Sequence, residues 1–173
     1  MQLLKIYYAY FSPGNTTEKV VSHIASSFQN YPVESINLTD YATRQEDYYF
    51  KENELLIIGV PAYGGRVPAP VVDALRHFTG SNTPVVLVAT YGNRDIDDTL
   101  IELKKNVIDK GFIPVSAASF VCQHTFLKEC AEGRPDEEDL KMAREFGDKL
   151  KERLRLLVTY DAGDLEVPGT FPY

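Results

Sequence analysis

The chain has 173 residues, 44% of them hydrophobic, and its formal net charge is −7. This length is typical of a single domain, and the apolar fraction is sufficient for a packed core. The negative charge argues against a general surface for nucleic acid or anionic membrane, and no apolar run approaches the roughly 20 residues that a membrane span needs.

The amino terminus and the cysteine content indicate the expected compartment. Residues 1–6 lack the basic start and the small-residue cleavage site of a signal peptide, and they are typical of a strand. Cys122 and Cys130 are too few to build a disulfide framework or a thiolate cluster by themselves. We therefore expect a cytoplasmic protein with two reduced thiols.

Apolar runs alternate along the chain with segments of helical periodicity. In chain order, we expect a strand at residues 3–9, a helix at 16–28, a strand at 33–38, a polar connection at 39–53, a strand at 55–60 and a helix at 68–78. We then expect a strand at 84–89, a helix at 97–110, a strand at 113–121, a loop at 122–135 and a last helix from about 136 to 156.

This alternation predicts an α/β fold. The strands are nearly continuous apolar runs, as in a parallel sheet that is covered on both faces. Five such strands favour the order 2-1-3-4-5, with helices on both faces of the sheet. We expect one domain over residues 1–158. Residues 159–173 have no periodicity and several glycines and prolines, so we expect an extended tail or a linker there.

Three glycine-bearing loops follow the first, third and fourth predicted strands, and loops at the carboxyl ends of parallel strands gather at one edge, where ligands bind. In the first loop, Ser12, Thr16 and Thr17 carry hydroxyl groups. Gly14 and Asn15 tolerate a positive φ, which allows consecutive amides to form an anion-binding nest before the next helix. The loop is therefore a candidate phosphate site. An ordinary strand–helix turn with a Ser/Thr cap remains the alternative.

The second and third loops have residues that can hold a flat ring. The second loop consists of Pro61, Ala62, Tyr63, Gly64, Gly65 and Arg66, and the third of Thr90, Tyr91, Gly92, Asn93 and Arg94. The two tyrosines offer faces for stacking, the asparagine and nearby amides can meet a polar ring edge, and the paired glycines allow close backbone approach. The two arginines could place positive charge beside a reduced, anionic ring. Together with the phosphate site, these loops predict flavin mononucleotide (FMN) as the cofactor.

Five segments of the chain resemble flavodoxins, and most closely the flavodoxin half of bacterial and archaeal flavodoxin–ferredoxin fusion proteins. They are residues 10–13, 61–68, 89–94, 133–136 and 167–173. The resemblance covers nearly the whole chain. It implies a flavodoxin-like three-layer sandwich, noncovalent FMN binding, electron transfer, and a redox partner protein, for which a ferredoxin domain is one candidate.

Two departures from that family stand out. Its phosphate loop usually reads Ser-Pro-Thr-Gly-Thr-Thr, whereas Gly14-Asn15 replace Thr-Gly here. The fusion proteins also continue into a ferredoxin domain with cysteines for iron–sulfur clusters, and this chain stops where that domain would begin. In addition, the family has a histidine-containing segment after the fifth strand. His124 stands there in this chain, either as a surface histidine or as a residue that covers the ring or meets a substrate.

The leading hypothesis is an electron-transfer flavoprotein rather than a classical enzyme, in which the protein sets the potential and the flavin supplies the redox chemistry. One alternative is an NAD(P)H-dependent FMN or quinone reductase. Another is a flavodoxin-like scaffold that does not bind flavin. Asp95, Asp97 and Asp98 form either an acidic docking rim or the capped start of a helix.

Overall fold

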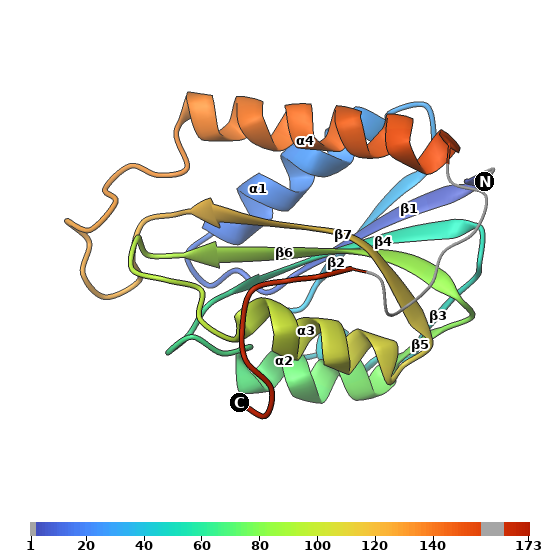
Figure 1. Cartoon of the computed structure of the whole chain (residues 1–173), viewed down its shortest axis with the longest axis horizontal. Coiled ribbons are helices and arrows are strands. Elements are labelled where there is room, and N and C mark those ends of the chain that lie inside the picture. The colour runs from blue at the N-terminus through green and yellow to red at the C-terminus, as the bar shows by residue number, and fades with distance from the viewer. Residues whose placement is uncertain (1–2, 157–164) are drawn as a thin grey trace.

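The computed structural model describes residues 3–156 and 165–173, and its centre is a five-stranded parallel sheet (Figure 1). The strands are β1 (Lys5–Tyr10), β2 (Val33–Asn37), β4 (Glu54–Pro61), β6 (Thr83–Tyr91) and β7 (Phe112–Val121). Their order is β2-β1-β4-β6-β7, which is 2-1-3-4-5 when only these five strands are counted in chain order. All neighbouring pairs are parallel. The predicted α/β fold class is confirmed.

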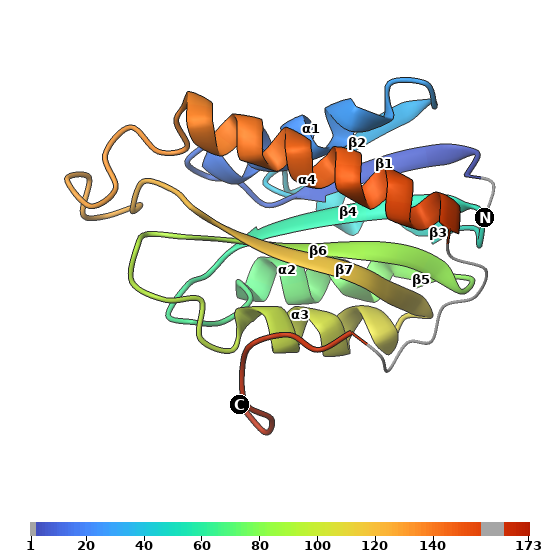
Figure 2. The ribbon, with the colours of Figure 1, turned by 45° about the horizontal axis from the view of Figure 1, so that its top comes forward.

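Helices cover both faces of the sheet and make a three-layer fold (Figures 1 and 2). On one face lie α1 (Thr16–Ala25) and α4 (Glu137–Leu156), and on the other α2 (Ala69–Ala74) and α3 (Thr99–Ile108). β4 and β6 are buried along almost their whole length, and one hydrophobic cluster packs on each face of the sheet. Within the described ranges, no helix combines the length and the apolar character that crossing a membrane requires.

Two short strands outside the central sheet differ from the sequence-based expectation. β3 (Tyr48–Phe50) and β5 (Phe78–Gly80) pair in parallel, in segments where we expected a polar connection and the end of a helix. Buried rings explain this pairing, because Phe50 lies 5.3 Å from Phe78 and 5.3 Å from Phe112 between ring centroids. Packing of these aromatic side chains overrides the local pattern.

The C-terminal segment, residues 165–173, lies alongside α3 in both views (Figures 1 and 2). Leu165 and Val167 pack against the hydrophobic cluster on that face of the sheet. Residues 165–173 are packed on the domain, and residues 159–164 of the expected tail or linker lie outside the described residues. The predicted domain boundary after residue 158 lies outside the described residues.

Candidate cofactor-binding site

The carboxyl ends of the parallel strands meet at one edge of the sheet, at the left in Figure 1, and the loops there surround a cavity of about 360 Å³. The cavity is lined by Thr16, Pro61, Ala62, Tyr63, Gly64, Gly65, Thr90, Tyr91, Gly92, Arg94, Asp95, Cys122, Gln123, His124, Thr125 and Phe126. All three predicted loops therefore contribute to one cavity. Its volume lies in the range of small-molecule sites, roughly 300–1,000 Å³.

The first loop brings the start of α1 to the cavity. Thr16 is the first residue of α1 and lines the cavity, and the first amides of a helix have no intrahelical acceptor. Of the two residues expected at positive φ, only Asn15 adopts it, at 59°, while Gly14 faces open space. The Asn15 N–H donates to the Ser12 carbonyl at 3.0 Å, and the buried Ser12 Oγ accepts the N–H of Glu18 at 3.1 Å. The loop therefore offers a helix N-terminus to an anion, whereas the Ser12 hydroxyl is already used within the loop.

Thr17 faces the protein interior. Its side chain and that of Thr90 are both about 1% exposed, and their Oγ1 atoms lie 2.7 Å apart, so one hydroxyl donates to the other. This bond joins the first turn of α1 to the end of β6. Thr16 is therefore better placed than Thr17 to donate a hydroxyl to a phosphate.

The second loop is a tight turn that requires glycine. Tyr63 and Arg66 exchange two backbone hydrogen bonds of 3.1 and 3.2 Å across Gly64 and Gly65, whose φ values are 59° and 76°. Two consecutive positive φ values are typical of a type I′ turn. A Cβ atom at Gly65 would lie 2.3 Å from Asp97 Oδ2, whereas nothing lies within 4 Å of one at Gly64. Packing within the protein thus explains Gly65, and Gly64 leaves the cavity edge open.

The third loop packs against a histidine. A Cβ atom at Gly92 would lie 2.5 Å from His124 Cδ2. His124 Nδ1 accepts the N–H groups of Phe126 and Leu127, both at 3.1 Å. His124 lines the cavity and fixes the turn that follows it.

The two arginines of the loops are paired with carboxylates. Arg66 donates to Glu102 through Nε and Nη2 at 2.7 and 2.8 Å, and this pair of bonds raises the pKa of the guanidinium. Arg94 forms an ion pair with Asp97. Arg94 lines the cavity, whereas Arg66 lines a neighbouring hollow beside the C-terminal segment. The positive charge expected beside the ring is therefore partly compensated by neighbouring carboxylates.

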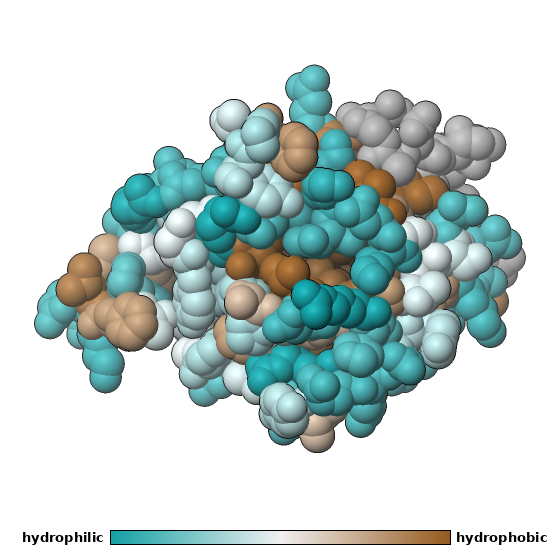
Figure 3. Space-filling view, turned by 90° about the horizontal axis from the view of Figure 1, so that it is seen from below, coloured by the Kyte–Doolittle hydropathy of each residue, from teal (hydrophilic) through white to brown (hydrophobic). Residues whose placement is uncertain are grey.

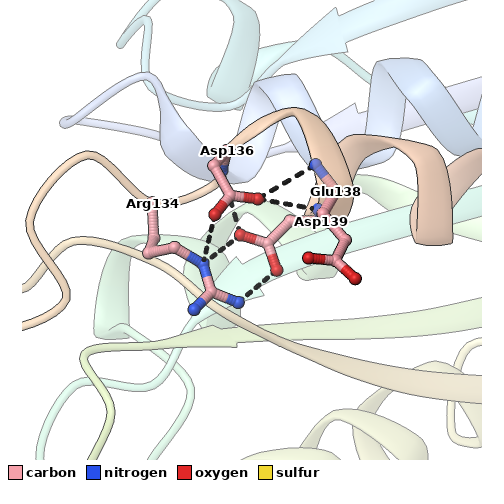
Figure 4. Close-up of polar contacts among 4 residues, drawn as sticks. All are labelled: Arg134, Asp136, Glu138 and Asp139. Atoms are coloured by element: carbon pink, nitrogen blue, oxygen red, sulfur yellow. Dashed lines mark hydrogen bonds and ion pairs between the residues drawn. The ribbon is translucent and has the colours of Figure 1, made fainter.

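A fourth segment, residues 122–135, contributes residues 122–126 to the cavity lining and is anchored on α4 through Arg134 (Figure 4). Arg134 forms an ion pair with Asp139 through both Nε and Nη2. Asp136 Oδ1 accepts the N–H groups of Glu138 and Asp139 at 3.0 Å each, and the Asp139 carboxylate accepts the N–H of Asp136 at 2.9 Å. These reciprocal bonds form a capping box at the start of α4. The Arg134 guanidinium holds the pKa of the Asp139 carboxyl below its ordinary value.

The two cysteines are free thiols, as expected. Cys122 lines the cavity, and burial raises the pKa of its thiol to about 12, so it is neutral at pH 7. Cys130 Sγ donates to the Gly92 carbonyl at 3.2 Å and ties the fourth segment to the third loop. In the part of the chain that the structure describes, no cluster of His, Cys, Asp and Glu is arranged to hold a metal ion.

Exposed apolar side chains project from the fourth segment. Phe126 is 86% exposed and Leu127 is 61% exposed. Brown atoms stand out at the protruding end of the molecule, at the left in Figure 3. Because Phe126 also lines the cavity, this apolar surface lies at the cavity mouth.

The structure brings most of the predicted site residues together. Those that line the cavity are Thr16, Pro61, Ala62, Tyr63, Gly64, Gly65, Thr90, Tyr91, Gly92 and Arg94, and those outside its lining are Ser12, Gly14, Asn15, Thr17, Arg66 and Asn93. The sequence-based site left out Asp95 and residues 122–126. The available signal was their position directly after the fourth and fifth strands, at the same sheet edge. Contact of any of these residues with a cofactor stays a prediction.

Comparison with solved structures identifies the fold. A flavodoxin from the domain Archaea matches with a TM-score of 0.60 and 13% identity, over 88% of this chain and 99% of that chain. A flavodoxin of Streptococcus pneumonia TIGR4 matches with a TM-score of 0.60 and 15% identity, over 86% of this chain and 99% of that chain. Rubredoxin oxygen:oxidoreductase from Desulfovibrio gigas matches with a TM-score of 0.57 and 14% identity, over 89% of this chain and 37% of that chain. No protein-family model matches the sequence, and no curated protein matches it.

These likenesses define the fold as flavodoxin-like. The two flavodoxins are covered over almost their whole length, whereas the oxidoreductase contains the same fold as a part of a longer chain. Because the identities are between 13% and 15%, the cofactor and activity of this chain must be argued from its own cavity.

Proposed function

We propose that this protein binds FMN noncovalently in the cavity at the carboxyl edge of the sheet and acts in electron transfer. The observation that carries the proposal is the meeting of the three predicted loops in one cavity of about 360 Å³. FMN would supply one- and two-electron chemistry, and the protein would supply binding, orientation and electrostatics. The flavodoxin-like fold and the family resemblance of the same loops support the choice of cofactor.

The residues present fit a phosphate at one end of the cavity. The N-terminus of α1 offers the positive end of the helix dipole and amides without an intrahelical acceptor, of which the Glu18 amide is bonded to Ser12 Oγ. Thr16 would add its hydroxyl, since it lines the cavity, while the hydroxyls of Thr17 and Thr90 satisfy each other. Gly14 leaves the approach to this helix end open.

The second and third loops fit a planar ring. Tyr63 and Tyr91 line the cavity from two different loops and offer faces for stacking. The Tyr63 carbonyl already accepts the N–H of Arg66, and the Gly65 carbonyl accepts the N–H of Asp98 at 3.0 Å. The carbonyls of Ala62 and Gly64 are therefore our candidates for accepting a proton-bearing ring nitrogen, and Gly64 has the space for its peptide to turn.

The partner would be a redox protein that docks at the mouth of the cavity, and a ferredoxin-type domain is one candidate. Phe126 and Leu127 support this, because exposed apolar side chains beside a cavity are typical of an interaction surface. Asp95 also lines the cavity and contributes negative charge at its edge.

Titration of the cofactor-free protein with FMN, followed by quenching of flavin fluorescence, tests the proposal. Riboflavin serves as the control ligand because it lacks the phosphate. We expect FMN to bind much more tightly than riboflavin, and Thr16→Val to weaken FMN binding by about tenfold, the loss of one hydrogen bond to a charged group. Thr79→Val, an exposed threonine of β5, is the matched control. Equal binding of both flavins would contradict the phosphate site, and no binding of either would contradict the function.

A further inference from the structure

The C-terminal segment, residues 165–173, crosses α3 and reaches the second loop of the cavity. Lys104 Nζ donates to the Leu165 carbonyl at 2.7 Å, which fixes the start of the segment on α3. Gly169, with a φ of 121°, lies flat against the helix, since a Cβ atom there would lie 2.5 Å from Ile101 Cγ2. The segment therefore follows α3 closely towards the cavity edge (Figures 1 and 2).

The end of the segment contacts two residues that belong to or hold the second loop. The Thr170 N–H donates to Asp98 Oδ1 at 2.8 Å. The ring of Tyr173 lies 4.3 Å from the guanidinium carbon of Arg66, a cation–π contact. Phe171 packs edge-on against Tyr173, with the ring centroids 5.4 Å apart.

Asp98 and Arg66 also connect the second loop to α3. The Asp98 N–H donates to the Gly65 carbonyl at 3.0 Å. Glu102, one helical turn further along α3, accepts the two guanidinium bonds of Arg66 and also the N–H of Val67 at 2.9 Å. The second loop is thus held by α3 through the same residues that the C-terminal segment contacts.

We propose that the C-terminal segment is a positioning element for the second loop, and that Tyr173 and Thr170 are its positioning residues. Tyr173 stacks on Arg66, and Thr170 binds the carboxylate of Asp98, whose N–H holds the Gly65 carbonyl, so both contacts restrain the Gly65–Arg66 side of the turn. Tyr63, Gly64 and Gly65 of that turn line the cavity. The segment thereby affects the affinity of the cavity for FMN. This inference rests on the proposed FMN function.

The consequence is a coupling between a surface segment and the cavity. Loss of the ring at position 173 leaves Arg66 bound to Glu102 but removes the contact on its other side. The turn then has more freedom before FMN binds, and ordering it on binding weakens the affinity. An exposed cation–π contact corresponds to about a two- to fivefold change in Kd.

Tyr173→Ala in the full chain tests the proposal, with Tyr173→Phe as the conservative variant that keeps the ring. Tyr49→Ala, an exposed tyrosine of β3, is the matched control. Two quantities are measured: the Kd for FMN, and the hydrogen-exchange rates of the Arg66, Val67 and Asp98 amides in the cofactor-free protein. We expect Tyr173→Ala to raise both the Kd and these exchange rates, while Tyr173→Phe and the control stay at the values of the original chain.

The two measurements separate this inference from the proposed function. If the original chain does not bind FMN, the proposed function fails and the exchange rates alone decide the positioning role. Unchanged exchange at these three amides in Tyr173→Ala would overturn the inference. Faster exchange with an unchanged Kd would also overturn it, because the segment would then restrain the loop without any effect on the ligand.

Discussion

The buried hydroxyl pair Thr17–Thr90 allows a sharp test of how the first and third loops are joined. Valine has the shape of threonine, so Thr17→Val removes one hydroxyl and leaves the Thr90 hydroxyl buried without this partner. Leaving a buried polar group unsatisfied costs about 1–3 kcal/mol, whereas replacing both partners by apolar groups of the same shape is nearly neutral. We therefore expect each single variant to be destabilised by about 1–3 kcal/mol. The double variant should be close to the original chain.

Urea unfolding of the cofactor-free proteins, followed by circular dichroism, gives the four free energies of this double-mutant cycle. For a chain of this size, each 1 kcal/mol corresponds to a shift of about 2–4 °C in Tm, so thermal unfolding provides a second readout. The Kd of Thr17→Val for FMN should be that of the original chain, because the Thr17 hydroxyl is bonded to Thr90. A double variant as unstable as the sum of the two singles would refute the reasoning.

Two further predictions concern the fourth segment. Because Arg134 lowers the pKa of the Asp139 carboxyl, this group stabilises the folded chain above the unfolded-state pKa of about 4, and the contribution is lost as the pH falls through the folded-state value. Asp139→Asn should therefore lower the free energy of unfolding by about 1–3 kcal/mol at pH 7. Urea unfolding at lower pH should show a smaller difference between the variant and the original chain. A difference that does not change with pH would contradict a stabilising role of the ionised Asp139 carboxylate. Gly92→Ala should displace His124, since the new Cβ would lie 2.5 Å from His124 Cδ2, and should weaken FMN binding in the same fluorescence titration while the far-ultraviolet circular dichroism spectrum is unchanged. An unaltered FMN affinity in Gly92→Ala would show that the position of His124 does not affect FMN binding.

The central sheet could be predicted because its signals are local. Buried parallel strands are continuous apolar runs, and the loops after them contain the glycines that tight turns require. The pairing of β3 with β5 could not be predicted in this way. It depends on the contact of Phe50, Phe78 and Phe112, which are far apart in the sequence and meet only after the fold has formed.

The same limit applies within the cavity. The sequence identifies hydroxyls, but it does not determine which of them are used internally. Thr16 and Thr17 are adjacent and chemically identical, yet one lines the cavity and the other bonds to Thr90 across the sheet edge. Likewise, the sequence indicates positive charge at Arg66 and Arg94 but not the carboxylates that pair with them.

The glycines of the loops have different physical reasons for being glycine. Gly65 and Gly92 are required because the side chains of Asp97 and His124 occupy the space where a Cβ atom would be. Gly64 has a positive φ, and nothing lies within 4 Å of a Cβ atom there, so the turn geometry and not packing explains this glycine. A glycine-rich loop therefore does not by itself indicate a ligand. In this chain, the proposal of a flavin site depends on Gly64, the helix N-terminus at Thr16 and the two cavity-lining tyrosines together.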